Sequence, residues 1–339
     1  MLTSLTMTIL MMLMATSIAL ASDAAVLEGQ ARALLVWKDS LDNQSQQALH
    51  SWGNTSTPCN WLGISCGTGM HWGRHQPMIN SISLRGMRLR GALEPLNFSA
   101  LSTLTRLDLS YNYHAGNILP GIQVLEELRA LLLQDNQIRG SIPLGLGNLT
   151  NLHSLVLHEN EVSGGEVPRQ IGNMSSLVNL DLSNNHLVGH IPSKLGHLKH
   201  LVILDLSCNN LSGSIPSSIG DLSKLTTLYL HYNQISGNIP REIGYLEKLE
   251  YLELENKTLT GSIPISIGNL TKLTTFYVCT NQISGHIPWE LGYLENLEEL
   301  ILSNNTLTGS IPDSLGNLTK ITILVEPTFW TYPSRTRSP

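Results

Sequence analysis

Charged and aromatic side chains are scarce in this chain of 339 residues. Asp, Glu, Lys and Arg together make up 14% of the sequence, and Phe, Trp and Tyr make up 5%. The formal net charge is −6, so the chain has no basic excess that could track a phosphate backbone. We therefore expect no nucleic-acid partner. Hydrophobic residues reach 42% of the sequence, which is enough for one large core or for several small units.

Long apolar runs are also scarce, because only the N-terminus contains one. The run LTMTILMMLMATSIAL is followed by Ala, and residues 19–21 have the small-x-small form that signal peptidase recognises. This pattern predicts a signal peptide over residues 1–21 and a secreted, extracellular chain from Ser22. An uncleaved anchor is the alternative, since no Lys or Arg precedes the run. No later stretch approaches the roughly 18 apolar residues of a spanning helix, so we expect no transmembrane helix in the mature chain.

Only four cysteines are present. Cys59 and Cys66 lie in PCNWLGISC, close enough to form a disulfide in an oxidising compartment. A zinc site at this pair would need two further ligands at fixed spacing, and the sequence does not supply them. We expect neither a metal nor a cofactor.

Catalytic motifs are nearly absent. Gly63 to Gly67 spell G-x-S-x-G around Ser65, the form of a hydrolase nucleophile elbow, but that motif requires a strand-to-helix turn in an α/β sheet. We expect the match to be a coincidence beside the disulfide. The sequence has no kinase catalytic loop, no phosphate-binding glycine loop followed by Lys and no H-E-x-x-H. The 12 histidines are scattered and predicted to be solvated, and we predict that the chain is not an enzyme.

What the sequence does have is a repeat. Ile-Pro or Val-Pro pairs recur at a step of 24 residues after one first interval of 25. The prolines are Pro143, Pro168, Pro192, Pro216, Pro240, Pro264, Pro288 and Pro312. This period, together with the order L-x-x-L-x-L-x-x-N-x-L, is the signature of leucine-rich repeats.

Each repeat begins with a short predicted strand. In LVILDLSCN, Leu204 and Leu206 alternate with Asp205 and Ser207, so the leucines point inward and stacked copies form a parallel sheet. Asn209 follows, and its amide can donate and accept at once in a buried turn, which predicts a structural ladder between coils. The same position holds Asn112, Asn136, Asn160, Asn185, Asn233, Asn281 and Asn305.

The rest of each repeat returns the chain to its starting edge. Gly213 permits a turn, Ile215 re-enters the core, and Pro216 fixes an extended entry to an irregular outer arc. Leu222 and Leu225 complete the coil. No coil can bury its leucines alone, so the stacked repeats make the core.

Four residues break or test the pattern. Lys257 takes a ladder position, where we expect local loosening or a partial replacement by Asn256, and Met87 takes the position in the first coil. Cys208 and Cys279 lie three coils apart, about 14 Å, which is beyond the reach of a disulfide. We predict that these two cysteines are not bridged to each other.

These motifs resemble a known family. The pattern LxxLxLSxNxLSGxIPxxLGxL over residues 82–325, preceded by ALLVWKDSL, Trp52 and CNWLGISC, is similar to the extracellular part of plant leucine-rich-repeat receptor kinases and receptor-like proteins. The resemblance implies an α/β repeat fold: a leucine-rich-repeat solenoid that forms a curved right-handed superhelix, with a parallel sheet on its inner face and a small helical, disulfide-bonded N-terminal cap. We place the cap at residues 22–78, about ten repeats at 79–325 with the last one partial, and a non-repeat, disordered tail at 326–339.

The resemblance leaves two functions open. The first is a receptor-like ectodomain, truncated before its membrane helix and kinase, that binds a peptide or protein ligand or another receptor ectodomain in cell-surface signalling. The second is a free secreted inhibitor similar to polygalacturonase-inhibiting proteins, which act in defence. Length and the missing kinase favour the inhibitor, whereas the inhibitors' additional cap cysteines are missing here. We favour the receptor-like function.

The inner face offers candidate ligand-binding residues in three consecutive coils. Most coils fill the outward positions with Asp and Ser, as at Asp181, Ser183, Asp205 and Ser207, which we expect to be solvated scaffold. The coils that depart from this filling carry aromatic and acidic side chains, which are typical anchors of an interface. The predicted ligand-binding residues are Tyr229, His231, Tyr232, Glu253, Glu255 and Tyr277. The alternative is a solvated strip without a partner.

N-glycosylation sequons are frequent along the chain. They begin at Asn43, Asn54, Asn97, Asn148, Asn173, Asn210, Asn256, Asn269, Asn304 and Asn317. Four of them share one repeat position, five residues after the Pro of Ile-Pro or Val-Pro: Asn148, Asn173, Asn269 and Asn317. Glycans at these four positions would line one outer edge of the solenoid, and that edge would be a poor binding surface.

Overall fold

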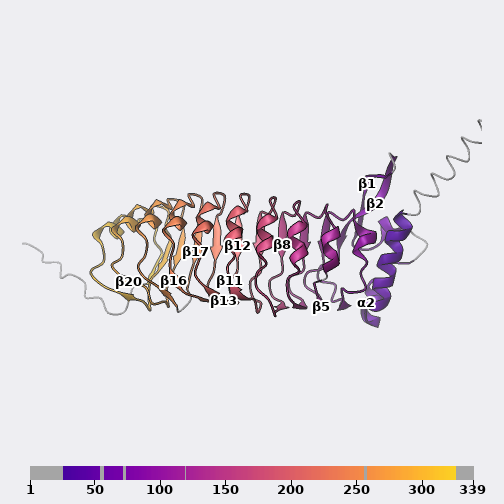
Figure 1. The fold of residues 1–339 in the computed structure, drawn as a ribbon, viewed down its shortest axis with the longest axis horizontal. Coiled ribbons are helices and arrows are strands. Elements are labelled where there is room, and N and C mark those ends of the chain that lie inside the picture. Colours follow the sequence, from indigo (N-terminus) through magenta and orange to yellow (C-terminus); the bar gives the residue numbers. More distant parts are fainter. Residues whose placement is uncertain (1–25, 54–56, 72–73, 119, 256–257, 326–339) are drawn as a thin grey trace, which may run out of the picture.

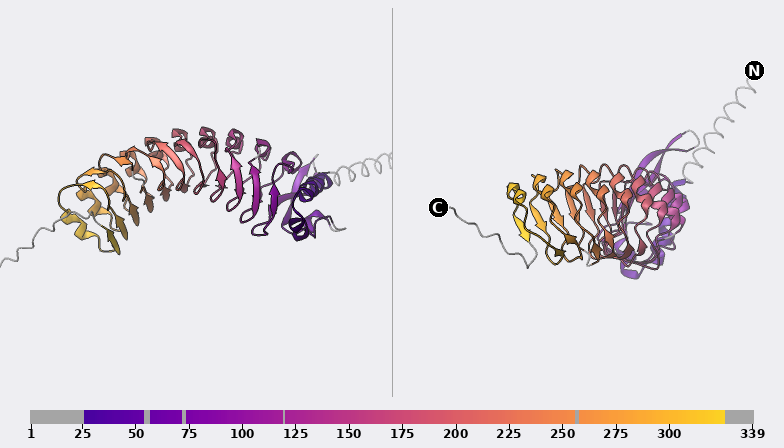
Figure 2. Two further views of the ribbon diagram at one scale, coloured as in Figure 1. Left: turned by 90° about the horizontal axis from the view of Figure 1, so that it is seen from below. Right: turned by 60° about the vertical axis from the view of Figure 1, so that its left-hand side comes forward.

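The computed structural model describes residues 26–53, 57–71, 74–118, 120–255 and 258–325. The chain forms a curved stack of coils with a cap of helices at its N-terminal end (Figure 1). One long sheet lines the concave side of the stack, and short helices line the convex side (Figure 2). This arrangement confirms the predicted leucine-rich-repeat solenoid.

The cap combines helices with a β-hairpin. A helix whose described part covers residues 26–40 is followed by α2 (Asn43–Ala48), where the side chain of Asp42 accepts a hydrogen bond from the N–H of Ser45. The hairpin joins β1 (Ile64–His71) to β2 (Arg74–Ser83) in antiparallel register, and β2 is also the first of the parallel strands of the long sheet. The hairpin therefore connects the cap directly to the repeats.

A disulfide and stacked tryptophans hold the cap together. Cys59, in the 3-10 helix η1 (Pro58–Asn60), is bonded to Cys66 in β1, as the spacing predicted. The rings of Trp52 and Trp61 stack with centroids 5.7 Å apart, and Trp37 lies 6.2 Å from Trp52. These three indoles are buried, so they form the cap's own core.

The G-x-S-x-G match lies in this hairpin. Ser65 is in β1 and pairs with Ser81 of β2, next to the disulfide. The residue therefore lies in an antiparallel strand and not at a strand-to-helix turn, which removes the structural basis of a nucleophile elbow.

The long sheet contains twelve strands in the described part of the chain, and all except β1 run parallel. After β2 the strands in order are β4 (Arg106–Asp108), β6 (Ala130–Leu132), β8 (Ser154–Val156), β10 (Asn179–Asp181), β12 (Ile203–Asp205), β14 (Thr227–Tyr229), β17 (Tyr251–Glu253), β19 (Thr275–Tyr277), β21 (Glu299–Ile301) and β23 (Ile323–Val325). The eleven parallel strands correspond to eleven coils, where the sequence indicated about ten.

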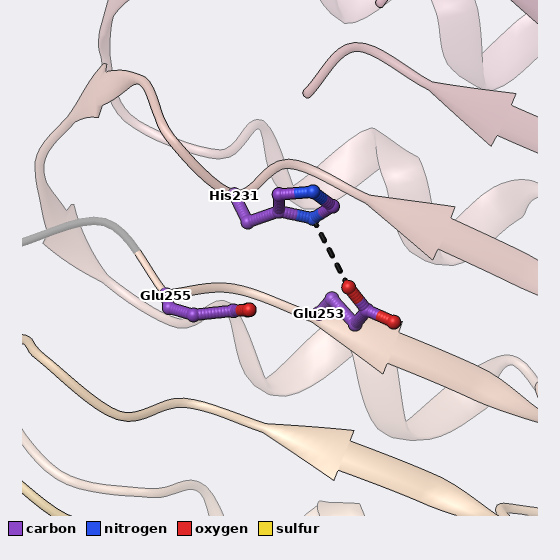
Figure 3. Close-up of side chains that lie close together, drawn as sticks. All are labelled: His231, Glu253 and Glu255. Atoms are coloured by element: carbon purple, nitrogen blue, oxygen red, sulfur yellow. Dashed lines mark ion pairs between the residues drawn. The ribbon is translucent and has the colours of Figure 1, made fainter. Parts of the chain in front are cut away.

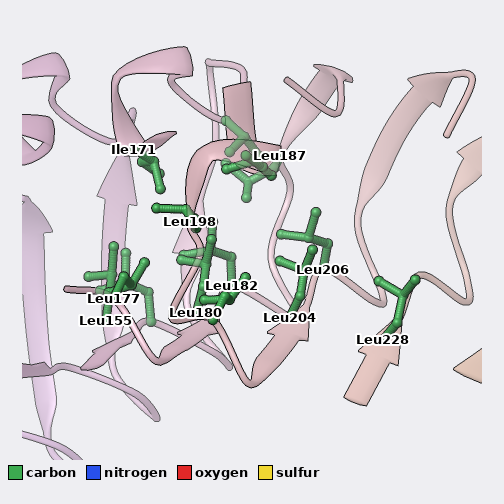
Figure 4. Close-up of a cluster of buried hydrophobic side chains, with 14 of the residues drawn as sticks. Leu155, Ile171, Leu177, Leu180, Leu182, Leu187, Leu198, Leu204, Leu206 and Leu228 are labelled. Atoms are coloured by element: carbon green, nitrogen blue, oxygen red, sulfur yellow. The ribbon is translucent and has the colours of Figure 1, made fainter. Parts of the chain in front are cut away.

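Leucines stack in register through these coils. Leu180, Leu204 and Leu228 are direct partners in neighbouring strands, and each is fully buried (Figure 4). The core is continuous from the cap to the last coils because every coil adds the same apolar positions.

The outer arc is more regular than the sequence indicated. A short 3-10 helix follows nearly every coil's turn: η2 (Phe98–Leu101), η3 (Pro120–Val124), η4 (Leu144–Asn148), η5 (Arg169–Asn173), η6 (Ser193–His197), η7 (Ser217–Asp221), η8 (Arg241–Tyr245), η9 (Ile265–Asn269), η10 (Trp289–Tyr293) and η11 (Asp313–Asn317). From η4 onward the repeated Pro is the N-cap, as Pro216 is for η7. A Cβ on Gly220 would collide with the backbone carbonyl of Glu242 in the next coil, so glycine permits this close stacking.

A second series of short strands lies beside the turn, and we did not predict it. It comprises β3 (Arg90–Ala92), β5 (Tyr113–Asn117), β7 (Gln137–Gly140) and β9 (Glu161–Val162), then β11 (Val188–His190), β13 (Asn210–Gly213) and β15 (Gln234–Ile235), then β16 (Gly237–Asn238) with β18 (Leu259–Thr260), and β20 (Ser284–Gly285) with β22 (Thr306–Leu307). The Leu-Ser-Gly-x-Ile-Pro part of the repeat forms these strands, and Gly213 ends one of them with a φ of 74°.

The ladder asparagines satisfy backbone groups of two coils at once. Asn136 Nδ2 donates to the carbonyls of Leu109 (3.0 Å), Leu133 (3.0 Å) and Gln134 (3.1 Å), and Oδ1 accepts from the N–H of His114 (2.9 Å). The same four contacts occur at Asn112, Asn160, Asn185, Asn209, Asn233, Asn281 and Asn305. Each of the eight amides therefore ties its coil to the preceding one. Lys257 lies outside the described residues, and Met87 packs partly buried against the core.

The residue before each ladder asparagine has left-handed backbone. The φ angle lies between 50° and 58° at Tyr111, Asp135, Glu159, Asn184, Cys208, Tyr232, Thr280 and Asn304. Non-glycine residues rarely adopt this conformation, and here the four hydrogen bonds of the following amide hold it. The ladder thus fixes the direction of one exposed or half-buried side chain per coil.

Two sequence-based expectations about polar residues were wrong. Ser183 and Ser207 are buried and not solvated. Each donates its N–H and its hydroxyl to the aspartate two residues earlier. For Ser207 this acceptor is Asp205, at 2.9 and 2.6 Å. His114 is fully buried and not on the surface, because it occupies a repeat position that other coils fill with Ile or Leu, such as Ile138.

The last coils are less well covered. Ile323, Leu324 and Val325 of β23 are 40–41% exposed, whereas Leu300, the register partner of Leu324, is fully buried. In the described part of the chain β23 is the C-terminal edge of the sheet, and β1 is the other edge. A search of the described residues finds no helix that is both long and apolar enough to cross a membrane.

Candidate inner-face site

Three consecutive strands bring the predicted ligand-binding residues together. Tyr229, Glu253 and Tyr277 end β14, β17 and β19 and are direct register partners. Their side chains alternate with buried ones such as Leu228 and Leu252, so they project from the concave surface and are half-buried there. The parallel sheet places them in one row, about one strand spacing apart.

His231 lies at the centre of an aromatic group. Its ring contacts Tyr229 edge-on with centroids 5.8 Å apart, and contacts Tyr232 at 5.3 Å with an interplanar angle of 81°. Tyr232 is 66% exposed and is one of the left-handed residues before a ladder asparagine. Its ring is therefore the most accessible part of the group.

Two carboxylates face His231 from the next coil. Nδ1 of His231 lies 3.2 Å from Oε2 of Glu253, and a ligand atom of Glu255 joins them, with all three within 4.8 Å of one another (Figure 3). Nδ1 of His231 and Oε2 of Glu255 are buried atoms, and neither has a hydrogen-bond partner among the described residues. These two atoms are therefore free to contact a ligand or an ion.

Acidic side chains gather on the inner face around this cluster. Burial raises the pKa of the Glu253 carboxyl to about 7, and the carboxylates of Glu255, Asp205 and Glu299 act in the same direction. Burial also raises the pKa of Glu255, while His231 lowers it. Burial raises the pKa of Tyr229 to about 12, so this phenol stays neutral and can donate a hydrogen bond.

Glu299 and Tyr251, which the sequence did not single out, complete the surface. Glu299 of β21 accepts a hydrogen bond from the Tyr277 hydroxyl, and this hydrogen bond raises the pKa of Tyr277. Tyr251, at the start of β17, is 39% exposed. Tyr251 and Glu299 both occupy the first outward position of their strands, which is also the position of Thr227 and Thr275. Inspection of this position along the repeat would have identified them.

The two remaining cysteines, Cys208 and Cys279, are free thiols, so the prediction that they are not bridged to each other is confirmed. Cys279 occupies the same repeat position as His231 and Glu255, one coil beyond Glu255. Burial raises the pKa of both Cys208 and Cys279, and the charge of Glu255 acts in the same direction. Both thiols are therefore held in the protonated form near neutral pH.

The described sequon asparagines are all on the surface. Asn148, Asn173, Asn269 and Asn317 end the 3-10 helices η4, η5, η9 and η11, on the convex side and away from the inner-face cluster. Asn43, Asn97, Asn210 and Asn304 are also exposed. Asn54 and Asn256 lie outside the described residues.

Models of known families match four segments of the chain. A leucine-rich-repeat N-terminal domain matches residues 27–67, and leucine-rich-repeat models match residues 127–149, 175–235 and 296–318. Together with the solenoid geometry, these matches identify the chain as a leucine-rich-repeat protein.

Within this class the chain is similar to plant receptor kinases. It is 31% identical over 156 residues to "Pollen receptor-like kinase 2" of Arabidopsis thaliana, covering 46% of this chain and 23% of the relative. Its structure resembles the Arabidopsis receptor kinase HAESA, solved with the peptide hormone IDA and the co-receptor SERK1, with a TM-score of 0.71 and 32% identity over 88% of this chain and 53% of the solved HAESA chain. The chain thus spans about half of that solved receptor and about a quarter of the curated relative. The resemblance that the motifs indicated is confirmed.

A plant ice-binding protein has the same fold at a similar length. Its TM-score is 0.59 and its identity 26%, with 84% of this chain and 89% of that protein covered. The matched family models are repeat and N-terminal repeat domains, and no kinase domain is among them.

Proposed function

We propose that the chain binds a peptide or protein ligand, or a second receptor ectodomain, at the plant cell surface, and that the inner face of the coils carrying Tyr229, Glu253 and Tyr277 is the binding surface. The chain acts by binding and not by catalysis. Any signal is transmitted by a kinase that the described residues do not contain.

The main support for this binding surface is the row of aromatic and acidic side chains on neighbouring strands of the sheet. Tyr229, Glu253 and Tyr277 come from three neighbouring strands whose register fixes their spacing. A partner meets these side chains already ordered, so little conformational entropy is lost on binding. Buried aromatic residues are the commonest hot spots of interfaces, and truncation of one typically weakens binding by about 2 kcal/mol.

The structural neighbours support a peptide ligand. HAESA was solved with a peptide hormone and a co-receptor, and the ectodomain of the receptor kinase GASSHO1/SCHENGEN3 was solved with Casparian strip integrity factor 2. The group of acidic side chains around Glu253 and Glu255 favours a ligand with a basic segment over an acidic one.

The domain organisation follows from the same proposal. We infer a signal peptide at residues 1–21, a cap at 22–78 and repeats at 79–325, with the chain exported to the cell exterior. Among the described sequons, those on the 3-10 helices lie on the convex side, so glycans there would leave the inner face open.

The test is a paired substitution on opposite faces of the solenoid. The double variant Tyr229→Ala/Tyr277→Ala removes two inner-face rings, and Tyr245→Ala/Tyr293→Ala removes two exposed rings from the 3-10 helices on the convex side. IDA and Casparian strip integrity factor 2 peptides serve as first probes in calorimetry, followed by a pull-down from plant apoplastic fluid. Inner-face truncation should weaken binding at least about tenfold with an unchanged melting temperature. Equal affinity for both variants would place the site elsewhere.

A free secreted binder is the second candidate. The ice-binding neighbour, 89% of which this chain covers, shows that a solenoid of this size also occurs with a different ligand. Inhibition of a purified fungal polygalacturonase by the chain would favour the inhibitor, and inhibition of ice recrystallisation would favour an ice binder. Neither activity is expected from a receptor ectodomain.

A further inference from the structure

We propose that His231, Glu253 and Glu255 bind one divalent transition-metal ion of the Zn²⁺ class on the inner face (Figure 3). The proposal is independent of which partner the surface binds, because it concerns the bare chain and the ion.

The geometry of the three ligand atoms fits one ion. Two ligands at 2.0–2.1 Å from a tetrahedral Zn²⁺ lie about 3.3 Å from each other. Nδ1 of His231 and Oε2 of Glu253 are 3.2 Å apart, and Glu255 offers an oxygen within 4.8 Å of both. Binding to the same ion would bring the Glu255 carboxylate to about 3.3 Å from the other two ligand atoms.

The protein leaves the ligand atoms unused in other contacts. The His231–Glu253 approach lacks hydrogen-bond geometry, and Nδ1 of His231 has no hydrogen-bond partner in the described structure. Oε2 of Glu255 is likewise buried without a partner. Unpaired buried polar atoms are costly and therefore uncommon, and a bound cation would satisfy both while it neutralises the two carboxylates.

The donor set selects the class of ion. Imidazole nitrogen suits Zn²⁺, Cu²⁺, Fe²⁺ and Ni²⁺, whereas Ca²⁺ and Mg²⁺ prefer sites made of oxygen alone with six or more ligands. One histidine and two glutamates supply three ligands, which resembles a zinc site that keeps one coordination position open. A water molecule or a partner's side chain would take that fourth position.

The sequence indicated no metal site, because the ligands come from two coils and form no compact motif. His231 precedes Glu253 by 22 residues, and only coil stacking brings them together. Cys279, in the same row as Glu255, is not among the three ligands.

The experiment titrates untagged, chelator-treated protein with ZnCl₂ by isothermal calorimetry near neutral pH. Because free thiols bind Zn²⁺ by themselves, the parent is the Cys208→Ser/Cys279→Ser variant. We expect one ion per chain, and a loss of affinity of at least about tenfold for each of His231→Ala, Glu253→Gln and Glu255→Gln. His158→Ala is the matched control, because His158 occupies the same repeat position as His231. At that position the next coil has Ser183 after His158 but Glu255 after His231. CaCl₂ should bind far more weakly than ZnCl₂.

Three results would overturn the proposal. The first is no Zn²⁺ binding in the thiol-free parent, which would assign any binding to the cysteines. The second is unchanged affinity in His231→Ala, with circular dichroism showing an intact fold. The third is Ca²⁺ binding as tight as Zn²⁺ binding, which would contradict the role of the imidazole.

Discussion

The backbone N–H of His114 donates to Oδ1 of Asn136 at 2.9 Å, from one coil to the next. The ring of His114 lies 5.6 Å from that of Trp37 in the cap. The side-chain amide of Asn136 thus holds the backbone of His114, and the His114 ring contacts Trp37 of the cap. Cap and repeats share one continuous core at this point.

Asn136→Ala should destabilise the chain by at least about 3 kcal/mol, because the substitution leaves buried carbonyl and N–H groups without partners at a cost of about 1–3 kcal/mol each. Gln137→Ala is the control, since Gln137 is exposed and adjacent. Urea unfolding followed by circular dichroism measures both. Similar midpoints for the two variants would show that water replaces the ladder contacts.

His114 should make stability depend on pH. Burial lowers the pKa of His114 to about 4, whereas the unfolded chain has the ordinary value of about 6.5. Above pH 6.5 both states are neutral and the stability is complete. As the pH falls from about 6.5 to about 4, only the unfolded chain gains the proton, so up to about 3 kcal/mol is lost.

Fluorescence of the buried cap tryptophans in guanidinium titrations at several pH values measures this effect. His114→Leu places the residue type of the neighbouring coils at this position and should flatten the profile between about pH 6.5 and 4. An identical slope in the variant would assign the pH dependence to other groups.

Reduction of the Cys59–Cys66 disulfide should destabilise the cap by about 2 kcal/mol, because the bond closes a short loop and restricts the unfolded chain. Cys59→Ser/Cys66→Ser should reproduce the loss, whereas Cys208→Ser/Cys279→Ser should not. Peptide mapping without reduction provides the covalent readout. A linked Cys208–Cys279 peptide would be incompatible with the stacking of the coils.

The edge of the sheet should be its weakest part. Leu300→Ala should cost about 3 kcal/mol because Leu300 is fully buried, whereas Leu324→Ala, at the partner position, should cost less than half of that because Leu324 is 41% exposed. Hydrogen exchange should show protection that falls from β21 to β23. Equal protection of both strands would mean that another segment or molecule covers β23.

The sequence by itself determined the solenoid, because its constraints are local and periodic. Two leucines that alternate with Asp and Ser, an Asn with donor and acceptor capacity, and a Pro at a step of 24 residues each require one backbone geometry per coil. The Cys59–Cys66 bond followed from close spacing. The period also placed Tyr229, Glu253 and Tyr277 on one face, since residues 24 apart become neighbours in the sheet.

Only the tertiary structure decided what those side chains contact. His231 and Glu253 lie in adjacent coils at different repeat positions. Their contact depends on the stagger of the strands and on side-chain rotamers, which the repeat pattern does not specify. The burial of His114 and of Ser207 likewise follows from neighbouring coils and the cap. Periodicity fixes which face a residue occupies, but desolvation depends on everything packed around it, and that is a property of the assembled stack.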